Sequence, residues 1–264
     1  MIRQLQSVAL VDLGENLSFD PQKLASKLNS MQKTWRFQVV GSKANLGEPD
    51  VDSIWFYIDR LLSQLETHKP AAKFDMVIGL THVRLENRDP VLGEPDRDYF
   101  SLSDRQRLGI VTEAMRQWNS PNKNLYQYLA FLIVGELLQI AAGVPLFHQS
   151  KEQCLFDDCA DRAELAPAIE RGRICPQSRH DLFKAQVSDA TINDAVRILN
   201  WCRRNSIAKS MELTFASPLV TLVIGTAVGW VTSSFLGPQW YKVVIVVTLV
   251  AFVVGFFRNR IAKR

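Results

Sequence analysis

The side chains best suited to hold a metal ion lie close together in the second half of the chain. Cys154, Cys159, Cys175 and His180 follow the spacing C-x4-C-x15-C-x4-H, and thiolate and imidazole are ligands that zinc prefers. The spacing is wider than that of a tight zinc knuckle, so two interpretations stay open, a structural zinc site or a set of free thiols. The sequence predicts no cofactor, with structural zinc as the alternative. His148 is either a further ligand or an ordinary loop histidine.

A second group of chemically capable residues interrupts an apolar segment that runs from Leu125 to Ala142. Glu136 and Gln139 are three residues apart, so they share one face of a helix. This polar pair, with Gln127 near the other end, predicts a buried central helix rather than a membrane span. Glu136 is then either an acid in an open cleft or a carboxyl group hydrogen-bonded inside a filled core. The filled core is the interpretation that base rates favour.

Strands and helices alternate in the sequence before this segment. Apolar runs predict strands over Val8–Leu13, Trp35–Val40, Met76–Leu80 and Arg107–Thr112. Asp20-Pro21 predicts the start of one helix, and the apolar periodicity of Asp50–Glu66 predicts another. A polar loop is expected from Glu86 to Asp98, a loop-rich segment from Cys154 to His180, and a last helix over Asp194–Arg204. The order predicts an α/β domain with a mixed sheet and a long central helix.

The last fifty residues have a different composition. No charged side chain occurs from Leu213 to Tyr241, and a second uncharged run extends from Val243 to Phe257. These runs predict a hairpin of two transmembrane helices, about 213–235 and 240–257, with Gly237-Pro238 in the short loop. At about 1.5 Å per residue, the helices would be roughly 34 Å and 27 Å long, enough for a hydrocarbon core of about 30 Å. Two parts follow, a domain over 1–205 and a hairpin with a basic tail over 206–264.

The distribution of basic residues predicts that both ends of the hairpin lie on the same side of the membrane. The chain has a formal net charge of +4, and residues 1–210 balance 26 basic against 26 acidic side chains. Basic residues flank both spans, so the sequence predicts an inner-membrane protein with both termini in the cytoplasm. The balanced charge of the first part gives no electrostatic case for nucleic acid, which is expected only through a partner. Cysteines in a cytoplasmic domain argue against disulfides.

The layout of residues 8–205 resembles the zincin metalloproteases, and archaemetzincins most of all. Short motifs of the second half carry the resemblance: Gly135-Glu136-Leu137-Leu138-Gln139, Gly143, His148, Cys154-Leu155-Phe156 and Ile174-Cys175-Pro176-Gln177-Ser178. In that family the central helix carries HExxHxxGxxH, and a cysteine-bearing Met-turn and a terminal CxxC follow. Two histidines one turn apart hold zinc there, and the adjacent glutamate is the general base.

The chain departs from the family pattern at the positions that hold the catalytic zinc. Gly135 and Gln139 stand where the two histidines are expected, and only Glu136 is retained. Pro145 falls at the third histidine position, Phe156 replaces the methionine, and Ser178 replaces the second cysteine of the final pair. A catalytic zinc needs three side-chain ligands. The resemblance therefore implies a degenerate zincin-like centre, and the chain is predicted not to be an enzyme.

A domain without catalytic groups joined to a bare hairpin is similar in layout to effectors of bacterial anti-phage or toxin systems. The sequence predicts that the cytoplasmic domain binds a protein partner or inhibitor and controls the hairpin in the lipid bilayer. Small residues in the spans, Gly225, Ala227, Gly229 and Gly255, predict oligomers through the transmembrane helices. Two alternatives stay open. One is an active membrane-tethered metallopeptidase with an altered ligand set such as Glu136, His148 and a cysteine, and the other is an inner-membrane scaffold.

Overall fold

The computed structural model describes residues 5–14, 17–41, 46–68, 73–88, 95–104, 107–114, 124–148, 152–159 and 162–204. Contacts divide the chain into two units, Met1–Arg204 and Asn205–Arg264. Both predicted membrane spans fall in the second unit, which lies outside the described residues. The transmembrane hairpin therefore stays a prediction, and the description below concerns the first unit.

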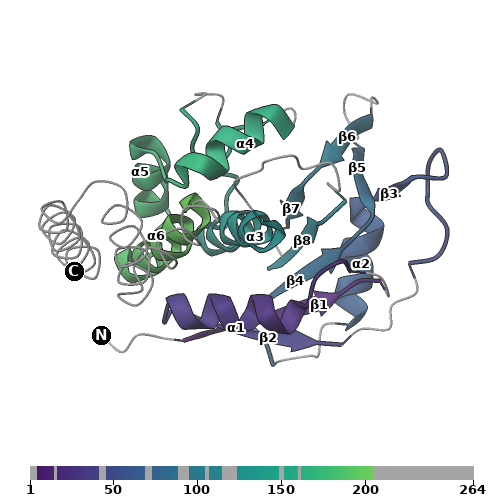
Figure 1. Ribbon diagram of the computed structural model, residues 1–264, viewed down its shortest axis with the longest axis horizontal. Coiled ribbons are helices and arrows are strands. Elements are labelled where there is room, and N and C mark those ends of the chain that lie inside the picture. The colour runs from purple at the N-terminus through teal and green to yellow at the C-terminus, as the bar shows by residue number, and fades with distance from the viewer. Residues whose placement is uncertain are drawn as a thin grey trace, which may run out of the picture. The chain divides into compact units, whose positions relative to one another are not determined.

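A five-stranded sheet forms the centre of this unit (Figure 1). Its strand order is β2 (Trp35–Val40), β1 (Gln6–Asp12), β4 (Met76–Thr81), β8 (Leu108–Thr112) and β7 (Ser101–Ser103). The first four strands are parallel, and β7 pairs antiparallel with β8 at one edge. All six residues of β4 and all five of β8 are buried, as expected for parallel strands covered on both faces. The predicted mixed α/β fold is confirmed.

The two faces of the sheet are covered by different helices. Alternate side chains of β1, such as Val8 and Leu10, join a cluster with α1 (Pro21–Met31), whereas Ala9 and Val11 join one with α2 (Ile58–His68). Asp20 caps α1 by accepting a hydrogen bond from the Gln22 backbone N–H, and Pro21 opens the helix, as the sequence predicted. The period-two alternation of a strand produces these two separate cores.

The central helix α3 (Leu125–Ala142) lies on the same face of the sheet as α1 and passes beside β7 and β8 (Figure 1). Asn124 and Gln127 form a capping box at its start, and Gly143, with φ 68°, ends it in the left-handed conformation. The helix is buried from Gln127 to Ile140. Three further helices are grouped beyond it: α4 (Arg162–Arg171), α5 (Pro176–Lys184) and α6 (Asp189–Arg203).

Three segments differ from their prediction. The helix expected from Asp50 begins only at Ile58, because Asp52 and Ser53 adopt positive φ angles and a short strand, β3 (Trp55–Tyr57), comes first. The loop expected from Glu86 to Asp98 instead carries parts of two strands, β5 (Arg84–Arg88) and β6 (Pro95–Tyr99), which form a small second sheet with β3. The segment expected to be rich in loops contains α4 and α5.

Of the described helices, α3 alone has the length and the apolar composition that could carry it across a membrane. Most of it is buried inside the domain. This agrees with the prediction that the segment from Leu125 to Ala142 is the core helix.

Candidate functional site

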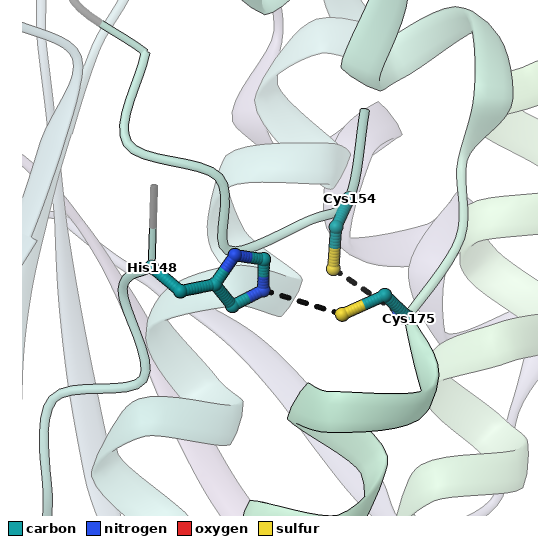
Figure 2. Close-up of side chains that lie close together, drawn as sticks. All are labelled: His148, Cys154 and Cys175. Atoms are coloured by element: carbon teal, nitrogen blue, oxygen red, sulfur yellow. Dashed lines mark hydrogen bonds between the residues drawn. The ribbon is translucent and has the colours of Figure 1, made fainter. Parts of the chain in front are cut away.

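His148, Cys154 and Cys175 come together beside the start of α5 (Figure 2). His148 follows the end of α3, Cys154 lies in the next described segment, 152–159, and Cys175 is the N-cap residue of α5. Two backbone hydrogen bonds fix the first two segments to each other, from His148 N–H to the Phe156 carbonyl at 3.0 Å and from Asp158 N–H to the His148 carbonyl at 3.0 Å. The Leu155 N–H donates to the Arg173 carbonyl at 2.9 Å, which brings in the segment before α5.

The ligand atoms of these three residues all lie within 4.8 Å of one another. His148 Nε2 is 3.2 Å from Cys175 Sγ. Ser178 Oγ contacts all three, at 2.8 Å from His148 Nε2, 3.2 Å from Cys175 Sγ and 3.4 Å from Cys154 Sγ. Neighbouring ligands of a tetrahedral zinc ion are about 3.3–3.8 Å apart, given bond lengths of about 2.0–2.3 Å. The four contacts given above, at 2.8–3.4 Å, are close to or slightly shorter than these separations, so zinc would fit among the four atoms after small shifts.

The surroundings of the group also suit zinc. His148 Nδ1 lies 3.1 Å from Asp157 Oδ1, although the two atoms are not aligned for a hydrogen bond. A carboxylate next to the outer nitrogen is the usual partner of a zinc-bound histidine. Cys154, Cys175 and Ser178 are buried, at 0%, 1% and 1% exposure. Such burial leaves little room for a substrate, so the donor set fits a structural zinc ion held by His148, Cys154 and Cys175, with Ser178 at the fourth position. Burial also raises the pKa of the Cys154 thiol, a cost that a metal ion would offset by binding the thiolate.

Two of the four predicted zinc ligands belong to this group. Cys154 and Cys175 are brought together, whereas Cys159 lines a separate cavity and His180 is exposed on α5. His148, for which the ordinary role was the more common interpretation, takes a place in the group instead. The spacing of the cysteines could not reveal that Ser178 and Asp157 also contact this group.

The second feature is a cavity of about 820 Å³ between the edge strand β7 and α3. Its walls come from Tyr99–Asp104, the middle of α3, residues 143–147 and residues 155–159, with Leu165. Glu136 and Gln139 both line it. Glu136 is buried and hydrogen-bonded, as the interpretation of a core carboxyl group expects, and it also borders this cavity.

Glu136 is held by neutral hydrogen-bond donors. Ser101 Oγ on β7 donates to Glu136 Oε1 at 2.5 Å, and Gln139 Nε2 donates to Oε2 at 3.3 Å. The carboxyl group is 1% exposed, and burial raises its pKa to about 7, although hydrogen bonds from Ser101 and Ser103 oppose the shift. A carboxyl group with a pKa near neutrality can both accept and donate a proton at physiological pH.

The cavity does not reproduce a zincin metal site. Leu155 covers Gly135, and a Cβ atom at that position would lie 3.5 Å from Leu155 Cδ1. A histidine there would have to displace the leucine. Gln139 offers an amide, a weak ligand, and the described lining residues include no histidine. The donor set around Glu136 therefore does not fit zinc, in contrast to the His148 group.

The two features share a wall. Asp157 lines the cavity and also contacts His148. Leu155, Phe156 and Asp158, which lie in the same segment as Cys154, line the cavity too. Cys154 N–H donates to Asp157 Oδ2 at 3.1 Å. An ion bound to Cys154 and His148 would thus hold one side of the cavity in place.

No protein-family model and no curated protein sequence matches the chain. Its structure is similar to the crystal structure of archaemetzincin from Methanopyrus kandleri, with a TM-score of 0.51 and 16% sequence identity, over 70% of this chain and 97% of that chain. The fold of the domain is zincin-like. The resemblance predicted from the motifs is thereby confirmed at the level of the fold.

Two predictions need correction at this point. The chain was expected not to be an enzyme and to need no cofactor, because imidazoles are missing at residues 135 and 139. The zincin-like domain nevertheless assembles a group that could hold a metal ion from residues outside α3, and its structural neighbour is an archaemetzincin. Both findings contradict those expectations, since counting ligands on one helix ignored the ligands that the following segments supply.

Proposed function

We propose that the chain is a zinc-binding, membrane-anchored protein of the inner membrane, whose zincin-like cytoplasmic domain binds a ligand or partner at the Glu136 cavity and thereby controls a two-helix membrane module. The setting that fits this layout is a bacterial anti-phage or toxin system. The observation that carries the proposal is the cavity itself. It has a volume of about 820 Å³ and includes the buried, ionisable carboxyl group of Glu136 in its wall, in a chain whose last fifty residues contain two long uncharged runs.

Three features support this proposal over a plain scaffold. The cavity is within the 300–1,000 Å³ range typical of small-molecule sites. Its wall is tied to a group that fits zinc, which would keep the site shaped without a ligand. The uncharged runs are joined by too few residues to form an outside receptor, so a signal would have to come from the cytoplasmic side.

The proposal is tested by expressing the full chain in a bacterial host and following growth and membrane potential with a voltage-sensitive dye. Depolarisation and growth arrest are expected when the chain is released from its partner, or when the hairpin is expressed without residues 1–204. A matched control carries Val223→Asp and Val247→Asp, which place a charge in each predicted span. If the wild-type chain and the free hairpin never depolarise the membrane, the effector function is wrong.

A second candidate, a peptide hydrolase, is favoured by one specific observation. Glu136 has the proton affinity expected of a general acid or base and lies in a cavity next to the edge strand β7. The described structure keeps it apart from the His148 group, so it would act without bonding the metal ion. Peptide cleavage by the purified chain that disappears in Glu136→Gln but persists in Glu170→Gln would establish this activity. Equal cleavage by both variants would exclude Glu136 as the responsible group.

A further inference from the structure

The charged groups that line the described part of the Glu136 cavity are all acidic. Its described lining residues include four carboxyl groups, Asp104, Glu136, Asp157 and Asp158, and no lysine, arginine or histidine. Asp157 is engaged by His148, and Asp104 accepts a hydrogen bond from Leu108 N–H at 2.9 Å. Among the described residues, the hydrogen-bond donors to Glu136 are neutral. The described part of the cavity thus supplies negative charge and no cation to balance it.

The cavity is also rich in aromatic side chains. Tyr99, Phe100, Phe131, Phe147 and Phe156 line it, together with aliphatic residues. The face of an aromatic ring attracts a cation, by about 0.5–2 kcal/mol in proteins, and apolar walls favour an apolar ligand body. Phe147 is half exposed, at 51%, so part of this apolar lining faces solvent. Exposed apolar surface next to a buried acid is what an amphiphilic ligand would cover.

We propose that the cavity binds a small organic cation, a protonated amine with an apolar or aromatic body, whose ammonium group pairs with Glu136. The ammonium would supply the positive charge that the described walls lack, and its N–H groups would bond the carboxylate. The Ser101 hydroxyl holds Glu136 Oε1 from β7, so the carboxylate is oriented before a ligand arrives. This inference rests on the proposed function and deepens it, because it names the chemical class of the ligand that the domain would sense.

The test compares three probes of similar shape and different charge on the full chain in lipid nanodiscs. Phenethylamine, 2-phenylethanol and 3-phenylpropionate are titrated at pH 8 by isothermal calorimetry, with empty nanodiscs as the blank. The amine is expected to bind at least about tenfold more tightly than the alcohol, as a charge-assisted hydrogen bond requires. The anion is expected not to bind. Equal binding of amine and alcohol, or tighter binding of the anion, overturns the inference without any substitution.

Variants then locate the interaction. Glu136→Gln keeps the shape and removes the charge, and it is expected to reduce amine affinity about tenfold or more while leaving the alcohol unchanged. Glu170→Gln, an exposed residue of α4 outside the cavity, is the matched control and is expected to bind as the wild type does. Unchanged amine affinity in Glu136→Gln overturns the inference.

The outcome separates this inference from the proposed function. A chain that depolarises membranes but does not prefer the amine overturns the ligand class alone. A chain that binds the amine through Glu136 and never depolarises a membrane supports the ligand class and overturns the effector function.

Discussion

At the scale of single residues, Glu136 combines two properties that soluble domains rarely allow together. It is almost fully buried, and its hydrogen-bond partners among the described residues are neutral. Burial without a counter-charge favours the protonated carboxyl group, which explains the raised pKa. The residue is therefore both a source of instability and a proton-exchanging group at neutral pH.

The raised pKa predicts how stability changes with pH. The pKa of Glu136 is about 7 in the folded state against an ordinary 4.5, so the folded protein binds a proton that the unfolded chain releases between these values. The free energy of unfolding should therefore fall as pH rises from about 4.5 to 7, by about 3 kcal/mol in total, and stay level above. Glu136→Gln should be more stable than wild type at pH 8 and similar at pH 5, measured by denaturant unfolding. An equal difference at both values would contradict the assignment.

Ser178 gives a second prediction at this scale. Its hydroxyl lies at the fourth corner of the His148 group, and a neutral hydroxyl binds zinc more weakly than a thiolate. Ser178→Cys should raise zinc affinity by at least about tenfold, measured by competition with a chromogenic chelator. Ser188→Cys, at the N-cap of α6 and outside the group, is the control and should leave affinity unchanged. Weaker binding by Ser178→Cys would show that the serine lies where the ion itself must be.

The residue types were predictable from the sequence, whereas their grouping was not. Cys154 and Cys175 were both candidates for a structural zinc site, because thiols with imidazoles nearby are typical of such sites. His148 was named only as a possible further ligand, because its place beside these two cysteines depends on a backbone contact with Phe156 that no spacing encodes. The openness of the Glu136 cavity is likewise a result of how β7 and residues 155–159 pack around α3.

At the scale of elements, the segment from Glu152 to Cys159 connects the two features of the domain. It supplies one metal ligand and one wall of the cavity. Within it, Cys154 N–H and Leu155 N–H are each bonded to a neighbouring segment or side chain. Loss of a metal ion should therefore loosen this segment first.

Metal removal tests this connection. Chelation should lower the melting temperature by several degrees, because an ion at 100-fold its Kd stabilises by about 2.7 kcal/mol. It should also speed amide hydrogen exchange over residues 152–159 while α3 stays protected. Cys175→Ser should abolish both responses, whereas Cys159→Ser, outside the group, should preserve them. Identical exchange before and after chelation would show that the metal ion does not hold this wall of the cavity in place.

Gly172 gives a prediction about how α4 packs on α6. Its φ is 48°, and a Cβ atom there would lie 2.6 Å from the Leu199 carbonyl oxygen. Gly172→Ala should therefore cost roughly 2–4 kcal/mol of unfolding free energy, from backbone strain and the clash combined. Gly41→Ala, where no atom lies within 4 Å and φ is not in the left-handed region, is the control and should change stability by less than about 1 kcal/mol. Equal effects would mean that α6 can move away.

Elements with a strong apolar pattern were predictable, and short polar ones were not. β1, β2, β4 and α3 match their predicted ranges within one or two residues at each end, since buried strands and the core helix are long and apolar. The strands β5 and β6 carry the sequences RLENR and PDRDY. Neither shows the alternation of a half-buried strand, so only their pairing in the second sheet, β5 with β3 and β6, identifies them. In α4, Pro167 inside the helix hid the pattern.

At the scale of the whole molecule, the sequence predicts that both ends of the hairpin lie in the cytoplasm. A phosphatase reporter fused after Gln239, between the spans, should be active because it faces the periplasm. The same reporter fused after Arg264 should be inactive, and a fluorescent protein fused there should fluoresce. The chain should require detergent for extraction. Recovery from the soluble fraction, or the opposite reporter pattern, would contradict the hairpin.

The apolar character of α3 has a consequence for synthesis. This helix leaves the ribosome before either predicted span, and its length and hydropathy resemble theirs. On the predicted topology, the insertion machinery would meet α3 before the two predicted spans. An acidic side chain costs about 2.5–3.5 kcal/mol to insert at the centre of such a segment and less toward an end, so Glu136 contributes part of this cost and helps to keep the nascent helix in the aqueous phase until the sheet can enclose it.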